Sequence, residues 1–200
     1  MSWAYGTLSS PPQTQLIEIW QHSQGDLIGY FLATARPDLV LALVGVDPIH
    51  RWDNAVREAN ASFFDDPATC IAKMIAFFSI TYPPDAPAWQ RTWHARRCRE
   101  MDDNVFFALC WGGWGDWEFG LGRKEVAIKT FGGKLRAPRL TFGCDEEAVG
   151  VDRNELPKGS DVDDVVVVTG KGHWFHQSDA EKFNAELERW LGTAGLLPGR

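Results

Sequence analysis

The stretch IWQHSQG at residues 19–25 decides how this chain is interpreted, because it places a serine between two regular elements. Residues 16–20 form a short β-prone run, and residues 26–36 carry apolar side chains close to helical spacing. The sequence therefore predicts a strand, a sharp turn at Ser23 and a helix. A second stretch, GHWFHQ at residues 172–177, places a histidine after an apolar run and before another amphipathic segment. Together the two stretches suggest a serine nucleophile and its base.

The segments around these stretches alternate between strand and helix patterns. Residues 39–46 form a nearly continuous apolar run, typical of a strand buried on both faces of a parallel sheet. Strand patterning returns at 139–142 and 165–168, and a helix is predicted over 179–191. This alternation predicts an α/β fold with a mostly parallel sheet. Residues 1–15 are rich in turn-forming residues and are interpreted as an irregular leader.

The middle of the chain, residues 49–136, has no regular strand pattern and is interpreted as an apolar helical insertion. Its best helix is predicted over 67–78, where an aspartate is available as the N-cap. A second helix is predicted over 88–101, after a proline-rich break. The glycine- and tryptophan-rich residues 111–117 are predicted to form a loop or a chain of turns.

Length and charge limit the classes of protein to consider. The chain has 200 residues, typical of one domain over 1–200, and a formal net charge of −7 with both signs interspersed, so a nucleic-acid partner is not expected. Its four cysteines show no metal-ligand spacing, and neither a metal nor a cofactor is expected. No apolar run reaches the roughly 18 residues of a membrane span, and no signal sequence opens the chain. We therefore expect a cytoplasmic protein without a membrane partner.

The order of these features resembles the α/β-hydrolase fold, from its nucleophile elbow to its C-terminus, over residues 16–191. The matching features are the x-Ser-x-Gly turn, an apolar strand ending in Val-Asp-Pro, a helical insertion, two further strands, and Gly-His before a last amphipathic helix. The chain order of serine, acid and histidine is the one that this fold uses. The resemblance implies an α/β-hydrolase domain in which 49–136 forms a helical cap and a small-molecule substrate is bound.

The chemistry of such a site explains the residue types. A serine hydroxyl is a poor nucleophile at neutral pH, so Ser23 needs a base, and His173 can take and return a proton near neutrality. A carboxylate would hold the imidazole in the productive tautomer. The backbone N–H of Gln24, at the start of the helix, could donate a hydrogen bond to an oxyanion.

The resemblance offers two positions for the acid, and the sequence leaves both open. The first is Asp47, at the end of the strand after the elbow helix. The second is the loop GCDE at 143–146, where family spacing favours Glu146 over Asp145. We favour Asp47, because that loop departs from the usual Gly-x-x-Asp.

Two departures from the family pattern bear on activity. Gln21 stands where the family has a small residue, two positions before the nucleophile. The strands that normally precede the elbow, and the loop with the second oxyanion donor, have no counterpart before residue 16. We therefore expect a truncated hydrolase domain in which residues 16–20 form an exposed apolar edge, through which the chain could form oligomers.

Aromatic residues and the other histidines have alternative interpretations. Trp111, Trp114 and Trp174 are candidates for the wall of a substrate pocket, although packing in the core is the favoured interpretation of such residues. The other histidines have no partners at metal-ligand spacing, and structural roles are favoured for His22, His50, His94 and His176.

Three functions are therefore compared. The first is a serine hydrolase acting on an ester, an amide or a related substrate. The second is a cofactor-free dioxygenase of the same fold, a group that cleaves quinolone-type rings. The stretches REMD at 99–102 and CWG at 110–112 resemble that narrower group. The third is a catalytically inactive remnant or interaction protein, suggested by Gln21 and by the missing strands.

Overall fold

The computed structural model describes residues 17–116 and 118–197, so the predicted irregular leader lies outside the described residues. A four-stranded sheet with the order β1-β2-β3-β4 forms its centre, and all neighbouring strands are parallel. This confirms the predicted α/β fold. The strands are β1 (Ile17–His22), β2 (Val40–Val46), β3 (Arg139–Gly143) and β4 (Asp164–Val167).

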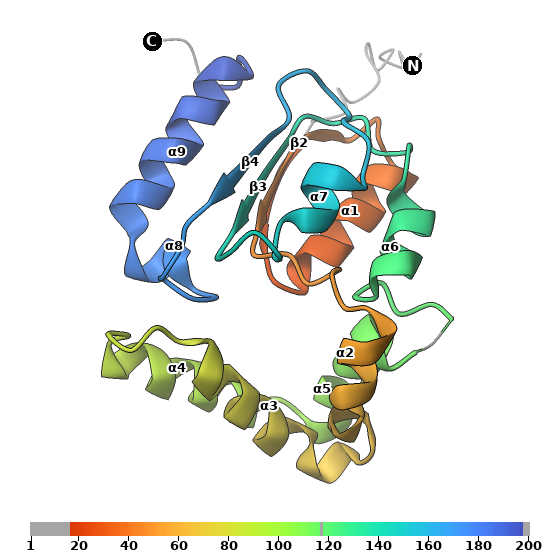
Figure 1. Cartoon of the computed structure of the whole chain (residues 1–200), viewed down its shortest axis with the longest axis vertical. Helices are drawn as coiled ribbons and strands as arrows, with labels where there is room; N and C mark the ends of the chain where they lie inside the picture. The colour runs from red at the N-terminus through yellow and green to blue at the C-terminus, as the bar shows by residue number, and fades with distance from the viewer. Residues whose placement is uncertain (1–16, 117, 198–200) are drawn as a thin grey trace, which may run out of the picture.

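Helices cover both faces of the sheet (Figure 1). One face is covered by α1 (Gly25–Ala35), α6 (Lys124–Phe131) and α7 (Gly150–Asn154), and the other by α8 (Phe175–Ser178) and α9 (Ala180–Thr193).

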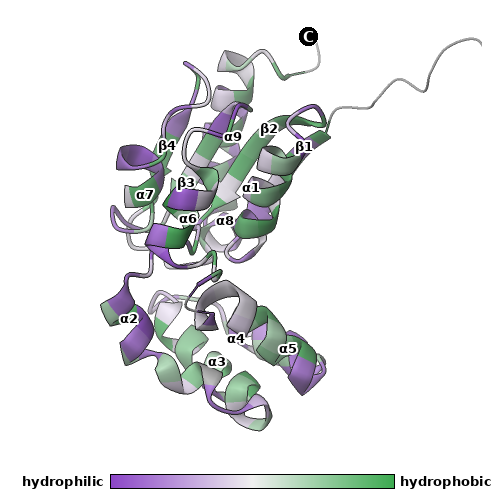
Figure 2. Cartoon of the chain, turned by 90° about the vertical axis from the view of Figure 1, so that its right-hand side faces the viewer, coloured by the Kyte–Doolittle hydropathy of each residue, from purple (hydrophilic) through white to green (hydrophobic). Residues whose placement is uncertain are grey.

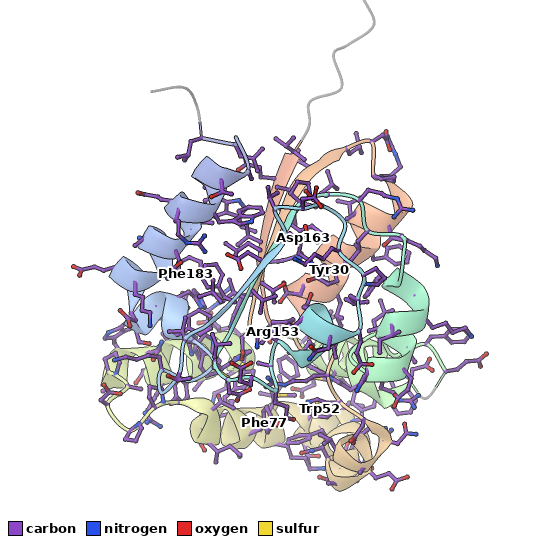
Figure 3. The ribbon with its side chains drawn as sticks, turned by 45° about the horizontal axis from the view of Figure 1, so that its top comes forward. Tyr30, Trp52, Phe77, Arg153, Asp163 and Phe183 are labelled. Atoms are coloured by element: carbon purple, nitrogen blue, oxygen red, sulfur yellow. The ribbon has the colours of Figure 1, made fainter. Side chains whose placement is uncertain are left out.

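Each face has its own apolar core. On the α9 side, the ring of Phe183 (labelled in Figure 3) lies 4.7 Å from that of Phe142 on β3, and the buried Trp190 belongs to the same apolar cluster. On the other side, Tyr30 of α1 packs edge-on against Phe131 of α6. Burial of β2 on both faces explains why its sequence is continuously apolar, whereas β3 is equally buried but includes Arg139 and Thr141.

The remaining helices form a separate layer beyond the carboxyl ends of the strands (Figure 2). In chain order they are α2 (Asn54–Ala59), the 3₁₀ helix η1 (Ala61–Phe64), α3 (Pro67–Thr81), α4 (Ala88–Arg99), α5 (Asp103–Cys110) and the π-helix η2 (Trp111–Gly115). Asp66 caps α3 by accepting a hydrogen bond from the N–H of Ala68. Of the helices in the described part of the chain, none is long and apolar enough to cross a membrane.

The prediction of a loop at 111–117 was wrong for residues 111–115, which continue α5 as a π-helical turn; residue 117 lies outside the described ranges. The turn closes through a hydrogen bond from the N–H of Asp116 to the carbonyl of Trp111 at 2.9 Å. Gly115 permits this turn, because a Cβ there would lie 2.5 Å from the Trp111 ring. Glycine was therefore needed for close packing here and did not end the helix.

Strand β1 lies at the edge of the described sheet, as expected for residues 16–20. Ile17 is 41% and Trp20 is 55% exposed, whereas every residue of β3 is buried. The strand therefore presents apolar side chains, and its outer edge pairs with no other strand in the part of the chain that the structure describes.

Candidate active site

Ser23 occupies the turn between β1 and α1 in a left-handed backbone conformation, with φ of 58°. Its N–H donates to the carbonyl of Val46 at 2.9 Å, which ties the turn to β2. Its carbonyl accepts from the N–H of Asp26 at 3.1 Å, at the first turn of the helix. Such a backbone is unfavourable for a residue with a Cβ and persists only where neighbouring contacts hold it.

The space for Gln21 comes from glycines on α1. A Cβ at Gly29 would lie 1.6 Å from Oε1 of Gln21, and a Cβ at Gly25 would lie 3.5 Å from the Gln21 Cβ. The larger residue of β1 is thus matched by small residues on the facing helix. Gln21 is therefore compatible with the tight strand–helix turn that the sequence alone put in doubt.

Asp47 follows the last residue of β2 and also has a left-handed backbone, with φ of 50°. Among the described residues other than glycine, Ser23 and Asp47 are the two with positive φ. The Oδ1 atom of Asp47 accepts from the N–H of Cys144 at 3.0 Å, and its Oδ2 atom pairs with Nδ1 of His173.

These contacts keep the Asp47 carboxylate ionised. Burial would raise its pKa, but the hydrogen bond and charge interaction with His173, together with Arg51 and the Cys144 N–H, lower the pKa of Asp47 to about 2. Because an ionised carboxylate only accepts hydrogen bonds, Nδ1 of His173 carries the proton and Nε2 is left as the basic nitrogen.

His173 lies in the loop between β4 and α8, and contacts with α3 and β1 hold that loop. The N–H of His173 donates to the carbonyl of Thr81, at the end of α3, at 3.2 Å. Its own carbonyl accepts from Nε2 of His22 at 2.9 Å. Gly172 has φ of 65°, and a Cβ there would lie 2.4 Å from the Thr81 oxygen. Glycine at position 172 is therefore required by the close approach of α3.

The histidines beside His173 are neutral. Burial lowers the pKa of His22 well below its ordinary value, and the charges of His173 and His176 add to this. Burial also lowers the pKa of His176 to about 4 and that of His94 to about 4. A neutral His22 with its proton on Nε2 suits its role as donor to the His173 carbonyl.

Ser23, Asp47 and His173 line one cavity of about 490 Å³ between the ends of the strands and the helical layer. Figure 3 shows Trp52 and Phe77 at this junction, with ring centroids 6.3 Å apart. The wall is mainly apolar, and its larger side chains include Trp52, Phe63, Met74, Phe77, Phe78, Phe106 and Trp114. An apolar lining around a few polar groups is typical of small-molecule sites.

The alternative acids lie differently. Asp145 lines the cavity, but its Oδ1 atom accepts from the N–H of Ala148 at 2.7 Å and its side chain is 56% exposed. Glu146 is 72% exposed and pairs with Arg153. Of the three candidate carboxylates, the structure brings Asp47 to His173 and gives the other two different partners.

The remaining candidates are divided between the cavity and the core. Gln24 and Trp114 line the cavity. Trp111 does not; it is 42% exposed and stacks on Phe107 at 6.2 Å. Trp174 is buried in the core, with its ring 4.5 Å from that of Tyr82.

Several lining residues were not identified from the sequence. Arg51 and Trp52 follow Asp47 in the turn after β2, and Cys144 is the residue whose N–H binds Asp47. Their place after the ends of predicted parallel strands was a usable signal, since ligands bind at this edge of an α/β sheet. The aromatic residues of α3 had no such signal, because an apolar helical face is equally typical of a core.

Within the described ranges, no three or more His, Cys, Asp or Glu side chains are grouped closely enough to hold a metal ion. His50 lies next to Arg51 in sequence but faces away from the cavity, where its Nε2 atom is 2.8 Å from Oδ2 of the buried Asp152. Tyr30 also donates to Asp152, at 2.5 Å. This second buried group is part of the core between α1 and α7.

Comparison with known proteins shows the fold. No family model matches the chain, and no curated protein sequence matches it. Solved structures do match: a bacterial membrane phospholipase A (16% identity, TM-score 0.59), a thermophilic esterase (19%, 0.61) and the haloalkane dehalogenase DatA from Agrobacterium tumefaciens C58 (12%, 0.64). They cover 91%, 90% and 90% of this chain, which spans only 58%, 67% and 67% of theirs. The chain therefore has the α/β-hydrolase fold over most of its length.

Proposed function

We propose that this chain carries the nucleophile, base and acid of a serine hydrolase acting on an ester, an amide or a related small molecule. The observation that carries the proposal is the pairing of Asp47 with His173 beside Ser23 in one cavity, with both Ser23 and Asp47 held at positive φ. Strained backbone at functional residues is typical of active sites.

In the proposed reaction, Ser23 attacks the carbonyl carbon of the substrate while Nε2 of His173 takes the hydroxyl proton. Asp47 orients the imidazole and offsets the positive charge that it gains. The N–H of Gln24, at the N-cap of α1, donates to the oxyanion. His173 then returns the proton to the leaving group, and water attacks the acyl-enzyme by the same route in reverse.

The cavity and the structural relatives support this class of reaction. An apolar wall that surrounds a few convergent polar groups suits an acyl or aromatic group held next to Ser23. An esterase and a phospholipase are among the proteins of similar fold. Because the chain spans about two thirds or less of their length, the activity of a complete enzyme is part of the proposal.

A fluorophosphonate probe tests the proposal directly, because it reacts covalently with an activated serine. We expect wild-type protein to be labelled at Ser23, and Ser23→Ala and His173→Ala to lose the label while remaining folded. Ser178→Ala is the matched control, because Ser178 lies on α8 outside the cavity and should not affect labelling. Absence of labelling in folded wild-type protein would count decisively against a serine hydrolase.

A cofactor-free dioxygenase is the second candidate. The same His173–Asp47 pair could remove a proton from an organic substrate, and the aromatic residues Trp52, Phe77 and Trp114 would hold a flat ring. Oxygen consumption would be measured with a 3-hydroxy-4-quinolone as substrate. Consumption that requires His173, in a protein whose Ser23 is not labelled by the probe, would favour this reaction over hydrolysis.

A further inference from the structure

Arg51 is the only lysine or arginine among the described residues that line the cavity. It lies in the turn after β2, where Ile49 and Trp52 also face the cavity and His50 faces the opposite way. Only 24% of the Arg51 side chain is exposed. The turn therefore directs a permanent positive charge into a mainly apolar site.

The guanidinium of Arg51 is poorly satisfied by the protein itself. Its ion-pair partner is Asp145, whose Oδ1 atom is 3.9 Å from Nη1, too far for a hydrogen bond. The Nη1 atom is excluded from solvent and donates no hydrogen bond to any described residue. A buried charged donor without an acceptor is unfavourable, and a ligand that brings an acceptor relieves that cost.

The two nearby carboxylates, Asp47 and Asp145, do not prevent Arg51 from binding a ligand carboxylate. Asp47 is paired with His173, and Asp145 is 56% exposed, so solvent screens its charge. Arginine presents a planar fork of donors that matches a carboxylate with two hydrogen bonds. An incoming carboxylate can therefore replace the loose contact with Asp145 by a closer one.

We propose that Arg51 binds a carboxylate of the substrate, whose apolar body fills the remainder of the cavity. The inference rests on the proposed hydrolase function and deepens it, because it names the substrate class as an ester with an apolar body and a free carboxylate. Arg51 is then a specificity-determining residue, outside the group that reacts.

Matched ester pairs test this proposal. Steady-state kinetics would compare 4-nitrophenyl esters of equal acyl length that end in a methyl group or in a carboxylate, over a short series of lengths. We expect wild-type protein to have a lower KM for the carboxylate esters. Arg51→Met and Arg51→Gln should raise the KM of the carboxylate esters about 10- to 100-fold relative to that of the methyl esters, the range for hydrogen bonds to charged groups. Loss of the charge interaction with Asp47 should change kcat by the same factor for both kinds of ester. Arg51→Lys should keep part of the preference.

Arg96→Met is the matched control, because Arg96 is exposed, pairs with Glu100 and lies outside the cavity. It should change neither ester. The inference is overturned if wild-type protein hydrolyses both kinds of ester without preference, or if the Arg51 variants impair both equally. Arg51 would then act only through the charge of Asp47, and the proposed hydrolase function would stand.

If neither kind of ester is hydrolysed, the proposed hydrolase function is wrong. The proposed carboxylate-binding site at Arg51, called here the anion site, is then tested by ligand binding. The tryptophan fluorescence of the protein, to which Trp52 and Trp114 in the cavity wall contribute, would be titrated with 4-phenylbutanoate and with 4-phenylbutanamide. Weaker binding of the carboxylate alone in Arg51→Met supports the anion site. Equal binding of the two compounds to wild-type protein overturns it.

Discussion

Asp47 and His173 are 126 positions apart in the chain, yet Oδ2 of the first contacts Nδ1 of the second at the carboxyl edge of the sheet. The contact is possible because Asp47 ends β2 while the loop that carries His173 is held against Thr81 and His22. Strand order, the helical layer and the elbow all contribute to this one pair. The first prediction concerns this contact between Asp47 and His173.

Asp47→Asn should reduce kcat for ester hydrolysis by about a thousandfold or more, because an amide favours the wrong tautomer of His173. Asp145→Asn and Glu146→Gln, measured alongside, should each retain most of the wild-type kcat. Equal loss in Asp47→Asn and Glu146→Gln would refute the assignment of Asp47.

Gly172→Ala should destabilise the protein and lower its activity, because its Cβ would strike the carbonyl of Thr81 that anchors His173. Gly170→Ala separates this clash from backbone strain: its φ is 76°, but no atom lies within 4 Å of the added Cβ. We expect Gly170→Ala to cost about 1 kcal/mol and to leave kcat unchanged. Urea unfolding and ester kinetics would measure both effects; a similar loss of kcat in both variants would contradict the role of the Thr81 contact.

Asp26→Asn should stabilise the protein at neutral pH. Burial raises the pKa of Asp26 well above its ordinary value, and the charges of Asp152 and Asp47 add to the rise. The folded state thus keeps a proton that the unfolded state releases, so stability is lost as the pH rises above the ordinary carboxyl pKa of about 4. The gain from asparagine should therefore shrink as the pH falls to that value.

Chemical denaturation at neutral and acidic pH would measure this difference. Asp161→Asn is the control, because it makes the same substitution at an exposed aspartate. If the difference in free energy of unfolding between Asp26→Asn and wild-type protein is the same at every pH, Asp26 binds its proton equally in the folded and unfolded states, and the prediction is wrong.

Trp20→Lys should reduce self-association, because it places a charge on the exposed edge strand β1. Trp89→Lys is the matched control: Trp89 is equally exposed, at 55%, but lies on α4. Light scattering over a range of protein concentrations would compare the two. Greater loss of association in Trp89→Lys would place the contact surface on the helical layer.

The regular elements were the most predictable part of the structure. All four strands were predicted to within two residues at each end, β2 because a strand buried on both faces is a nearly continuous apolar run, and the others because they are short β-prone segments between turn signals. The long helices α1, α3, α4 and α9 were also predicted, from their periodicity and flanking prolines. Short helices such as α7 and α8 were missed, since one or two turns carry too little periodicity to be distinguished from a loop.

The residues of the candidate site could be predicted from the sequence, but the contacts between them could not. Ser23, Asp47 and His173 each follow a strand pattern with a turn signal, which one sequence can reveal. The assignment of Asp47 over Glu146 depended on which carboxylate the His173 loop reaches, and that distance is set by packing across the sheet.

The sequence by itself determined the order of strands and helices, the turn at Ser23 and the short set of residues able to do acid–base chemistry, because these follow from local patterns. Only the tertiary structure decided that Asp47 meets His173, that Gly29 makes room for Gln21 and that Arg51 faces the cavity while His50 is buried behind it. These depend on contacts between segments far apart in the chain, whose geometry no local pattern contains.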